Sequence, residues 1–227
     1  MLLYEMRREA FCVACRAKWD IAKTEECGAC GKPICECTCM TQILSEVGAL
    51  CHHKTVVYSS GRAVVHRPIM YIKRNKSPRV AGFFAAQIER SLAADEDLPE
   101  LTPENAVISF VPRGRNAVLK YGFDQSAMIA EELSNIMGIP FVRTVSRRRG
   151  GKIQKKLNAK ERLKNVKRLF EASPELKELI SGKRVILVDD IVTTGASMAA
   201  CTSLLIKNRA REIICVSVAS TPFGKRR

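Results

Sequence analysis

The feature that most constrains the fold is the run VILVDDIVTTGAS at residues 185–197. Its first four residues are apolar β-formers, which predict a strand buried on both faces, as in a parallel sheet. Gly195 lets the backbone turn tightly and approach a ligand. A helix that begins near Ser197 would add free backbone N–H groups and a favourable dipole at its start. The run therefore predicts an α/β fold with an anion-binding loop after one strand.

The rest of the chain alternates strand-like and helix-like segments. Asp124 is the expected N-cap of one helix, and Gly138 followed by Pro140 gives its stop signal. A second helix is predicted at 197–208. Since strands and helices alternate, we expect a doubly wound parallel sheet. The predicted strands lie at 56–58, 107–111, 141–145, 185–188 and 213–219.

The loop after residues 185–188 carries side chains suited to a phosphorylated sugar. Thr193, Thr194 and Ser197 offer hydroxyls to a phosphate, next to the helix N-terminus. Asp189 and Asp190 cannot bind a phosphate directly, but they can accept hydrogen bonds from sugar hydroxyls. The pattern therefore indicates a sugar-phosphate site. The alternative is a surface turn in which Ser197 or Thr194 merely caps the helix.

The N-terminal part of the chain is rich in cysteine, with seven of the ten cysteines between Cys12 and Cys39. In a reducing compartment such crowding favours a metal site over disulfides. C-x-x-C spacing lets two thiolates meet one tetrahedral zinc, and an all-cysteine site is structural because it has no open position. Two ligand sets are open: Cys12, Cys15, Cys27 and Cys30, or Cys27, Cys30, Cys37 and Cys39.

The chain is strongly basic, with a net charge of +15 and a pI near 9.6. An excess of this size indicates polyanion partners such as nucleic acid or nucleotide phosphates. Residues 143–168 contain twelve basic side chains and a single acid, Glu161. Because no aromatic side chain interleaves there, contact with single-stranded nucleic acid would be electrostatic and strongly salt-dependent. A solvated face is the alternative, as it is for the smaller patch of Lys73, Arg74 and Lys76.

The run at 185–197 resembles the signature with which type I phosphoribosyltransferases bind 5-phosphoribosyl-1-pyrophosphate (PRPP). The resemblance implies a parallel sheet with a smaller hood, and Mg²⁺ that accompanies the pyrophosphate. Residues 143–168 resemble this hood. The resemblance also implies that Asp189 and Asp190 contact the ribose hydroxyls, which makes them the candidate catalytic residues. Residues 113–115 follow a predicted strand and are placed to meet the pyrophosphate. The implied PRPP-binding residues are Asp189, Asp190, Thr193, Thr194, Gly195, Ala196, Ser197, Arg113, Gly114 and Arg115.

Further features resemble the ComF family of competence-associated proteins. A cysteine-rich N-terminus precedes a phosphoribosyltransferase-like domain, and Tyr121 stands where the family usually has arginine. The resemblance implies a zinc-binding segment at 1–50, a phosphoribosyltransferase-like domain at 51–227, and a role in DNA uptake during natural competence. The matching residues are Val111, Pro112, Gly122, Phe123, Asp124, Gln125, Ser126, Gln154, Leu157, Arg162, Asn165, Val166 and Phe170.

Two functions are therefore expected. The first is a PRPP-binding protein of DNA uptake, with single-stranded DNA at the basic hood and DNA-uptake machinery proteins as partners. The alternative is an active phosphoribosyltransferase that transfers the pentosyl group of PRPP to a nucleobase or amide-nitrogen acceptor and has no DNA role. No apolar stretch approaches the roughly 20 residues needed to span a bilayer, and the N-terminus lacks the apolar core of a signal peptide. We therefore expect a cytoplasmic protein without a membrane span.

Overall fold

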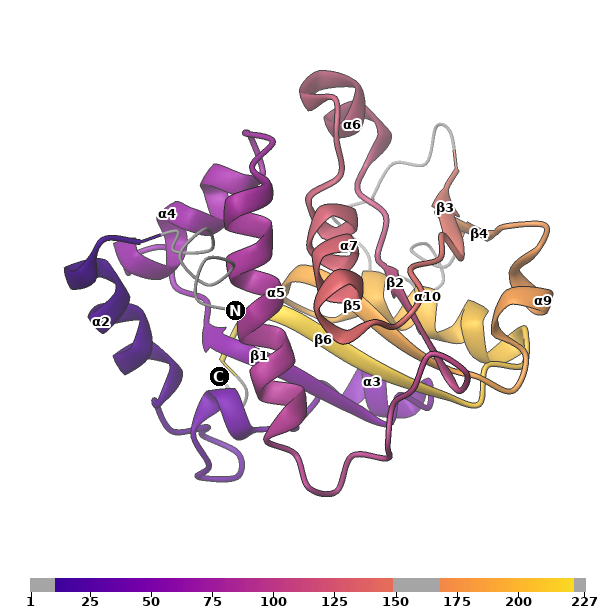
Figure 1. Cartoon of the computed structure of the whole chain (residues 1–227), viewed down its shortest axis with the longest axis horizontal. Helices are drawn as coiled ribbons and strands as arrows, with labels where there is room; N and C mark the ends of the chain where they lie inside the picture. Colours follow the sequence, from indigo (N-terminus) through magenta and orange to yellow (C-terminus); the bar gives the residue numbers. More distant parts are fainter. Residues whose placement is uncertain (1–10, 149–167, 223–227) are drawn as a thin grey trace.

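A parallel β-sheet forms the centre of the molecule (Figure 1). The computed structural model describes residues 11–148 and 168–222. Within these residues the central sheet has four strands, and every neighbouring pair runs parallel. In spatial order they are β1 (Cys51–Val57), β6 (Glu212–Ser220), β5 (Arg184–Val192) and β2 (Ala106–Phe110).

Both faces of the sheet are covered by helices, as the continuous apolar strands predicted. Alternate residues of β5 point to opposite layers: Ile186 and Val188 pack into one apolar cluster, and Val185 and Leu187 into the other. The first layer contains α2 (Val13–Lys23), α4 (Ala63–Ile72), α5 (Pro78–Ala93) and α7 (Gln125–Met137). The second contains α3 (Gln42–Glu46), α9 (Leu176–Ile180) and α10 (Ala196–Lys207).

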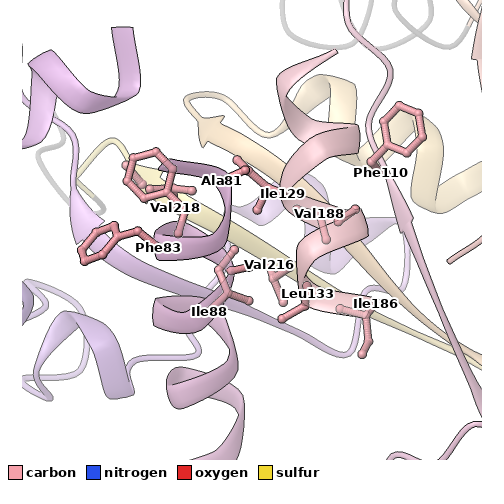
Figure 2. Close-up of a cluster of buried hydrophobic side chains, with 14 of the residues drawn as sticks. Ala81, Phe83, Ile88, Phe110, Ile129, Leu133, Ile186, Val188, Val216 and Val218 are labelled. Atoms are coloured by element: carbon pink, nitrogen blue, oxygen red, sulfur yellow. The ribbon is translucent and has the colours of Figure 1, made fainter. Parts of the chain in front are cut away.

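The first layer is built mainly by α5 and α7, which lie side by side across the strands (Figure 1). Figure 2 shows their side chains meeting those of the sheet: Phe83 and Ile88 come from α5, and Ile129 and Leu133 from α7. All four are buried. This packing holds the N-terminus of α7 close to the carboxyl end of β5, where the candidate site lies.

The predicted caps of α7 are confirmed. Asp124 Oδ1 accepts hydrogen bonds from the backbone N–H of Ser126 at 3.0 Å and of Ala127 at 3.4 Å. Gly138 ends the helix with φ of 68°, in the left-handed region that favours glycine. The helix predicted at 197–208 is confirmed as α10.

Four of the five predicted strands belong to the central sheet, but the prediction for 141–145 is largely wrong. Phe141 forms a single parallel bridge to Ile108, beside β2. Val145 instead begins β3 (Val145–Arg147), which pairs antiparallel with β4 (Phe170–Ala172) in a separate two-stranded ribbon. The chain leaves the sheet at Thr144, whose hydroxyl forms a buried 2.6 Å hydrogen bond with the hydroxyl of Ser109. The run of β-formers thus divides between two sheets.

The ribbon of β3 and β4 carries the two ends of the predicted basic hood. Arg147 lies over the Phe170 ring, with its guanidinium carbon 5.5 Å from the ring centre. Residues 149–167 lie outside the described residues, and with them most of the predicted hood.

The cysteine-rich segment packs on the sheet layers in two places. Trp19 of α2 is fully buried and contacts Phe83 and Phe84 of α5. Leu44 of α3 is also fully buried, but in the opposite layer, against α10. The division of the chain at residue 50 remains a prediction.

Over residues 11–148 and 168–222, none of the helices combines the length and the apolar character that crossing a membrane requires.

Candidate sugar-phosphate site and cysteine cluster

Asp189 lies near the end of β5 and faces the first turn of α7. Its Oδ1 accepts hydrogen bonds from Ser126 Oγ at 3.1 Å and from the backbone N–H of Asp190 at 2.9 Å. Burial, together with the neighbouring charge of Asp190, raises the pKa of the Asp189 carboxyl well above its usual value. The carboxylate of Asp189 is therefore costly to keep ionised until a cation or a hydrogen-bond donor arrives.

Asp190 is the more completely satisfied acid of the pair. Its Oδ1 accepts from the backbone N–H of Ile191 at 2.8 Å, and its Oδ2 accepts from Gln125 Nε2 at 3.3 Å. Lys73 Nζ forms an ion pair with the same Oδ2 at 2.9 Å. The Asp190 side chain is 6% exposed, so these polar groups surround it almost entirely.

The loop between β5 and α10 joins the acids to a helix N-terminus. Thr193 and Thr194 are exposed, and Gly195 adopts φ of 77° directly before α10. The backbone N–H of Ala196 donates to Thr194 Oγ1 at 3.4 Å, which is the cap expected by the surface-turn interpretation. The same geometry leaves the start of a twelve-residue helix beside two exposed hydroxyl side chains and two acids. An anion-binding loop needs these groups together.

Gly195 has a second role that the sequence did not indicate. A Cβ at this position would lie 2.6 Å from Thr41 Oγ1, 3.2 Å from Ile43 Cγ2 and 3.4 Å from Leu44 Cγ. The segment leading into α3 therefore fills the space where a side chain would be. The candidate phosphate loop rests directly on the cysteine-rich part of the chain.

Arg113 follows β2 and is held by several groups. Its backbone N–H donates to Asp124 Oδ2 at 2.6 Å, and its guanidinium carbon lies 4.8 Å from the centre of the Tyr121 ring and 5.8 Å from that of Phe123. Tyr121 stands where the ComF family usually has arginine. Its ring lies against the guanidinium group of Arg113 and stabilises the positive charge there. Arg113 Nη2 donates to the backbone oxygen of Lys73 at 2.7 Å. Nη1 is buried and has no partner among the described residues.

Gly114 and Arg115 continue from Arg113 into α6 (Arg115–Tyr121). Gly114 is the N-cap residue of that short helix, and Arg115 is exposed. A Cβ on Gly114 would lie 3.9 Å from Arg147 Nη1, so the base of the ribbon lies beside this loop. The loop at 113–115 contacts the segments that end α4 and begin α7, and these same segments contact the acids of β5. The first layer of the sheet therefore connects the loop with the acids.

Sequence reasoning did not assign roles to Lys73, Gln125 and Ser126. Gln125 and Ser126 belong to the GFDQS stretch, where two polar residues follow an N-cap and are nevertheless buried. Polar residues in the first turn of a helix otherwise packed on the sheet were an available signal. Lys73 stood out only as part of a basic patch.

Four cysteines converge in the N-terminal segment. The sulfur atoms of Cys27, Cys30, Cys37 and Cys39 all lie within 4.8 Å of one another, and those of Cys30 and Cys37 are 3.6 Å apart. A tetrahedral zinc with Zn–S bonds of about 2.3 Å places its sulfurs about 3.8 Å apart. The four residues therefore fit a structural zinc ion, which would join the turn at 27–30 to the strand-like segment at 37–39.

A buried lysine supports the carbonyl groups of this cluster. Lys54 of β1 is fully buried, and its Nζ donates to the backbone oxygens of Cys37 at 2.9 Å and Cys39 at 2.8 Å. Four thiolates around one Zn²⁺ carry two net negative charges, so an adjacent ammonium is favourable. The buried lysine is consistent with a metal-thiolate cluster.

The thiols of the clustered cysteines shift one another's pKa values. Burial raises the pKa of Cys27, but hydrogen bonds from the backbone N–H groups of Ala29 and Cys30 and from neighbouring thiols lower it to about 7. Burial and the thiols of Cys30 and Cys37 raise the pKa of Cys39 to about 12. Four thiols this close together do not all ionise without a cation, because each thiolate opposes the next.

The structure distinguishes between the two predicted ligand sets. Among the described residues the gathered group is Cys27, Cys30, Cys37 and Cys39. Cys12 and Cys15 lie outside it: Cys12 is the exposed N-cap residue of α2, and its thiol interacts with that of Cys15. The set of Cys12, Cys15, Cys27 and Cys30 is not brought together.

The region that contains the loop after β5 is similar to a known protein family. Residues 123–227 match the family described as "Phosphoribosyl transferase domain". This region contains β5, its two acids and α10, and the parallel, helix-covered sheet agrees with the fold that the resemblance to type I phosphoribosyltransferases implies. Residues 123–227, just under half of the chain, are therefore similar to a phosphoribosyl transferase domain.

Curated relatives narrow this class further. The chain is 32% identical over 93 residues to "DNA utilization protein YhgH" of Salmonella typhi, covering 40% of this chain and 39% of the relative. It is 32% identical over 93 residues to "Competence protein F" of Haemophilus influenzae, covering 40% of each. The matched region thus spans about two fifths of these relatives' lengths. With the domain match, these relatives bear out the resemblance to the ComF family.

Solved structures with weaker likeness include "Structure of the allosteric regulatory enzyme of purine biosynthesis". That match has a TM-score of 0.41 and 18% identity, and covers 66% of this chain and 30% of that one. A crystal structure of adenine phosphoribosyltransferase matches with a TM-score of 0.38 and 22% identity, covering 67% of this chain and 84% of that one.

Proposed function

We propose that this chain binds PRPP together with Mg²⁺ in the loop that follows β5. The observation that carries the proposal is the junction of three elements in a matched phosphoribosyl transferase domain. Asp189 and Asp190 lie in the last part of β5, Gly195 turns the chain, and α10 presents its N-terminus. Paired acids beside an anion-binding helix start suit a ligand that carries both hydroxyls and a phosphate.

Each part of the ligand has a proposed set of partners. Asp189 and Asp190 accept hydrogen bonds from the ribose hydroxyls, and residues 193–197 surround the 5-phosphate. Arg113, with its unpartnered buried Nη1, faces the pyrophosphate together with Gly114 and Arg115. Mg²⁺ would offset the pyrophosphate charge that these side chains leave.

Calorimetry with PRPP and Mg²⁺ tests the pocket. The wild-type protein is expected to bind, and Asp189→Ala is expected to weaken binding by at least about tenfold, because hydrogen bonds to a charged acceptor contribute about 1.5–3 kcal/mol. Asp97→Ala is the matched control, since Asp97 is an exposed acid outside the site. Wild-type protein that gives no heat with PRPP, or equal affinity in the Asp189 variant, would contradict the proposal.

Catalysis by the pocket is the enzymatic form of the same proposal. The chain would hold the ribose, neutralise the departing pyrophosphate and exclude water while an acceptor attacks the anomeric carbon. The acceptor would be a nucleobase or an amide nitrogen. Pyrophosphate release across a panel of such acceptors measures this activity. Release with none of them would leave a binding protein rather than an enzyme.

A role in DNA handling is the second proposed function, and it is favoured by two observations. The relatives are named for DNA utilization and competence, and the chain carries a net charge of +15. Arg143, Arg148 and Arg168 are exposed on the described ends of the hood. We therefore propose that the basic hood binds single-stranded DNA during DNA uptake, and that DNA-uptake machinery proteins are further partners.

The salt dependence of single-stranded DNA binding tests this role. Each phosphate that a basic side chain neutralises contributes about −0.7 to the slope of log K against log salt concentration. Arg148→Glu combined with Arg168→Glu is expected to weaken binding and flatten that slope, whereas Lys18→Glu, on the exposed side of α2, is expected to change little. A slope near zero for the wild-type protein would exclude phosphate contacts as the source of affinity.

The remaining parts of the proposal concern organisation and location. A structural zinc at Cys27, Cys30, Cys37 and Cys39 would stabilise the N-terminal segment, which we place at residues 1–50, ahead of the phosphoribosyltransferase-like domain at 51–227. A cytoplasmic location agrees with ten cysteines that are all free thiols in the structure.

A further inference from the structure

The strongest unexplained contact at the acid pair is made by Lys73, the residue that follows α4. Lys73 Nζ lies 2.9 Å from Asp190 Oδ2. Its side chain is 26% exposed, whereas that of Asp190 is 6% exposed, so the lysine is the outer member of the pair. Ile72, immediately before it, is fully buried and anchors the end of the helix. The ammonium therefore occupies an oxygen that a ribose hydroxyl would need.

Lys73 also contacts the loop at 113–115. Its backbone oxygen accepts the 2.7 Å hydrogen bond from Arg113 Nη2. One residue thus links the acids proposed for the ribose to the arginine proposed for the pyrophosphate. Arg113 Nη1 lies at this junction, buried and without a partner among the described residues.

Charge balance gives the lysine a role when a ligand binds. A ribose carrying a phosphate and a pyrophosphate brings several negative charges next to two carboxyl groups. Because like charges repel, the ligand's phosphates disfavour the ionised forms of these carboxyl groups. Asp190 is buried, so its ion pair with the ammonium breaks readily only when another donor replaces it, and a ribose hydroxyl that reaches Asp190 would be that donor. A flexible lysine can then bring its charge to a phosphate.

We propose that Lys73 is a ligand-binding residue of the sugar-phosphate site, with two positions. In the ligand-free protein its ammonium pairs with Asp190. When ribose hydroxyls reach Asp190, the ammonium turns to the phosphates of the ligand, next to Arg113. This inference rests on the proposed PRPP site and adds a residue from outside the region 123–227 that matches the domain family.

Calorimetry with PRPP and Mg²⁺ on four proteins tests the contact. Lys73→Ala is expected to weaken PRPP binding by about tenfold or more, as expected for a lost charge-assisted contact. Lys73→Arg is expected to recover part of that loss because it keeps the charge. Lys76→Ala is the matched control: it removes one positive charge from the same segment, is exposed, and is expected to stay within about twofold of the wild-type affinity.

A second ligand separates a contact with phosphate from an indirect effect through Asp190. Inorganic pyrophosphate with Mg²⁺ has no ribose hydroxyls, so its binding does not require Asp190. In an Asp190→Asn background, Lys73→Ala is still expected to weaken pyrophosphate binding by about tenfold, because the ammonium contacts phosphate. A lysine that serves only as the counter-ion of Asp190 would have no effect in that background.

The outcomes separate this inference from the proposed function. PRPP binding by the wild-type protein with unchanged affinity in Lys73→Ala would overturn the role of Lys73 and leave the PRPP site standing. Absence of PRPP binding by the wild-type protein would overturn both. Thermal unfolding of each variant shows whether a loss of affinity reflects a loss of fold, and Lys73→Arg, which keeps a cation beside the buried carboxylate of Asp190, is expected to unfold within a few degrees of the wild type.

Discussion

At the scale of single residues, the acid pair of Asp189 and Asp190 bears on the stability of the unliganded fold. Asp189 is held by Ser126 Oγ and by the backbone N–H of Asp190, yet burial and the adjacent acid raise its pKa. A carboxyl group whose pKa rises on folding is more favourable protonated than ionised in the folded state. A carboxyl group of this kind suits a binding site in which the ligand brings the hydrogen-bond donors to the carboxylate.

The substitution Asp189→Asn should therefore separate stability from binding. Asn keeps an oxygen that can accept from Ser126 and Asp190 but carries no charge. We expect the free energy of unfolding of the unliganded protein at neutral pH to rise by about 1 kcal/mol or more. PRPP binding should weaken, because the charged acceptor is lost. Urea unfolding and calorimetry measure the two effects.

The pH dependence of the Asp189→Asn stability difference has a defined sign. Below the unfolded-state pKa of about 3.9 the carboxyl is protonated in both states and the variant gains little. As pH rises through the raised folded-state pKa, the wild-type protein loses stability relative to the variant. Asp97→Asn, at an exposed acid, should show no such trend. A difference that does not grow between about pH 4 and about pH 8 would contradict this account.

At the scale of elements, the loop between β5 and α10 is constrained on the side away from its proposed ligand. Gly195 takes a positive φ and meets Thr41 in the segment before α3. The glycine is therefore needed for its backbone conformation and for its lack of a side chain. Packing of the cysteine-rich segment and geometry of the candidate phosphate loop are coupled at this contact.

Gly195→Ala tests that coupling, and Gly182→Ala is its matched control. Both glycines have φ above 70°, but a Cβ on Gly182 meets nothing within 4 Å, whereas one on Gly195 meets Thr41 Oγ1 at 2.6 Å. The shared left-handed conformation should cost about 1–2 kcal/mol at either position. Gly195→Ala should cost more by about 1–3 kcal/mol, because the added methyl overpacks the contact with α3.

A double-mutant cycle tests whether the additional loss of stability in Gly195→Ala comes from the contact with Thr41. Thr41→Ala removes the hydroxyl that the new methyl would strike, so the combination Thr41→Ala with Gly195→Ala should recover part of the lost stability. Chemical denaturation of the four proteins in the cycle supplies the numbers. Equal destabilisation by Gly195→Ala and Gly182→Ala would show that α3 does not press on the loop.

At the scale of the whole molecule, a metal at the cysteine cluster would connect the N-terminal segment to the sheet. Lys54 of β1 supports Cys37 and Cys39, and Thr41 lies two residues beyond Cys39 against Gly195. An ion at Cys27, Cys30, Cys37 and Cys39 would therefore restrain a segment that reaches the candidate phosphate loop. We expect metal binding to stabilise the entire fold rather than a detached ribbon.

Metal content of cysteine variants distinguishes the two predicted ligand sets. Purified wild-type protein is expected to hold one zinc per chain, and Cys37→Ser and Cys39→Ser should lose it, whereas Cys12→Ser and Cys15→Ser should retain it. Chelation should lower the melting temperature, since a ligand present at 100 times its Kd stabilises the folded state by about 2.7 kcal/mol. Loss of zinc in Cys12→Ser with retention in Cys37→Ser would instead support the first set.

Local patterns predicted a large part of this architecture. Apolar β-formers at 185–188 and 213–219 indicated buried parallel strands, and Asp124 and Gly138 marked the ends of α7. These signals are readable because strand burial and helix capping depend on residues close in sequence. The helices α4 and α5 went unpredicted, although Ser77 and Pro78 open α5 with a cap and an N1 proline. The apolar residues of α5 also recur at helical spacing, so the sequence offered a periodic signal for this helix.

The sequence alone determined the chemical character of the loop after β5 and the presence of a thiolate cluster, because both lie in short stretches of the chain. The tertiary structure alone decided which cysteines converge, that Lys73 pairs with Asp190, and that α3 fills the space beside Gly195. The contacts of Lys73 with Asp190 and of α3 with Gly195 join segments far apart in sequence, whereas the choice among the cysteines depends on how the N-terminal segment folds. Their geometry follows from how α4, α7 and the N-terminal segment pack on the two faces of one sheet, and no local pattern encodes that packing.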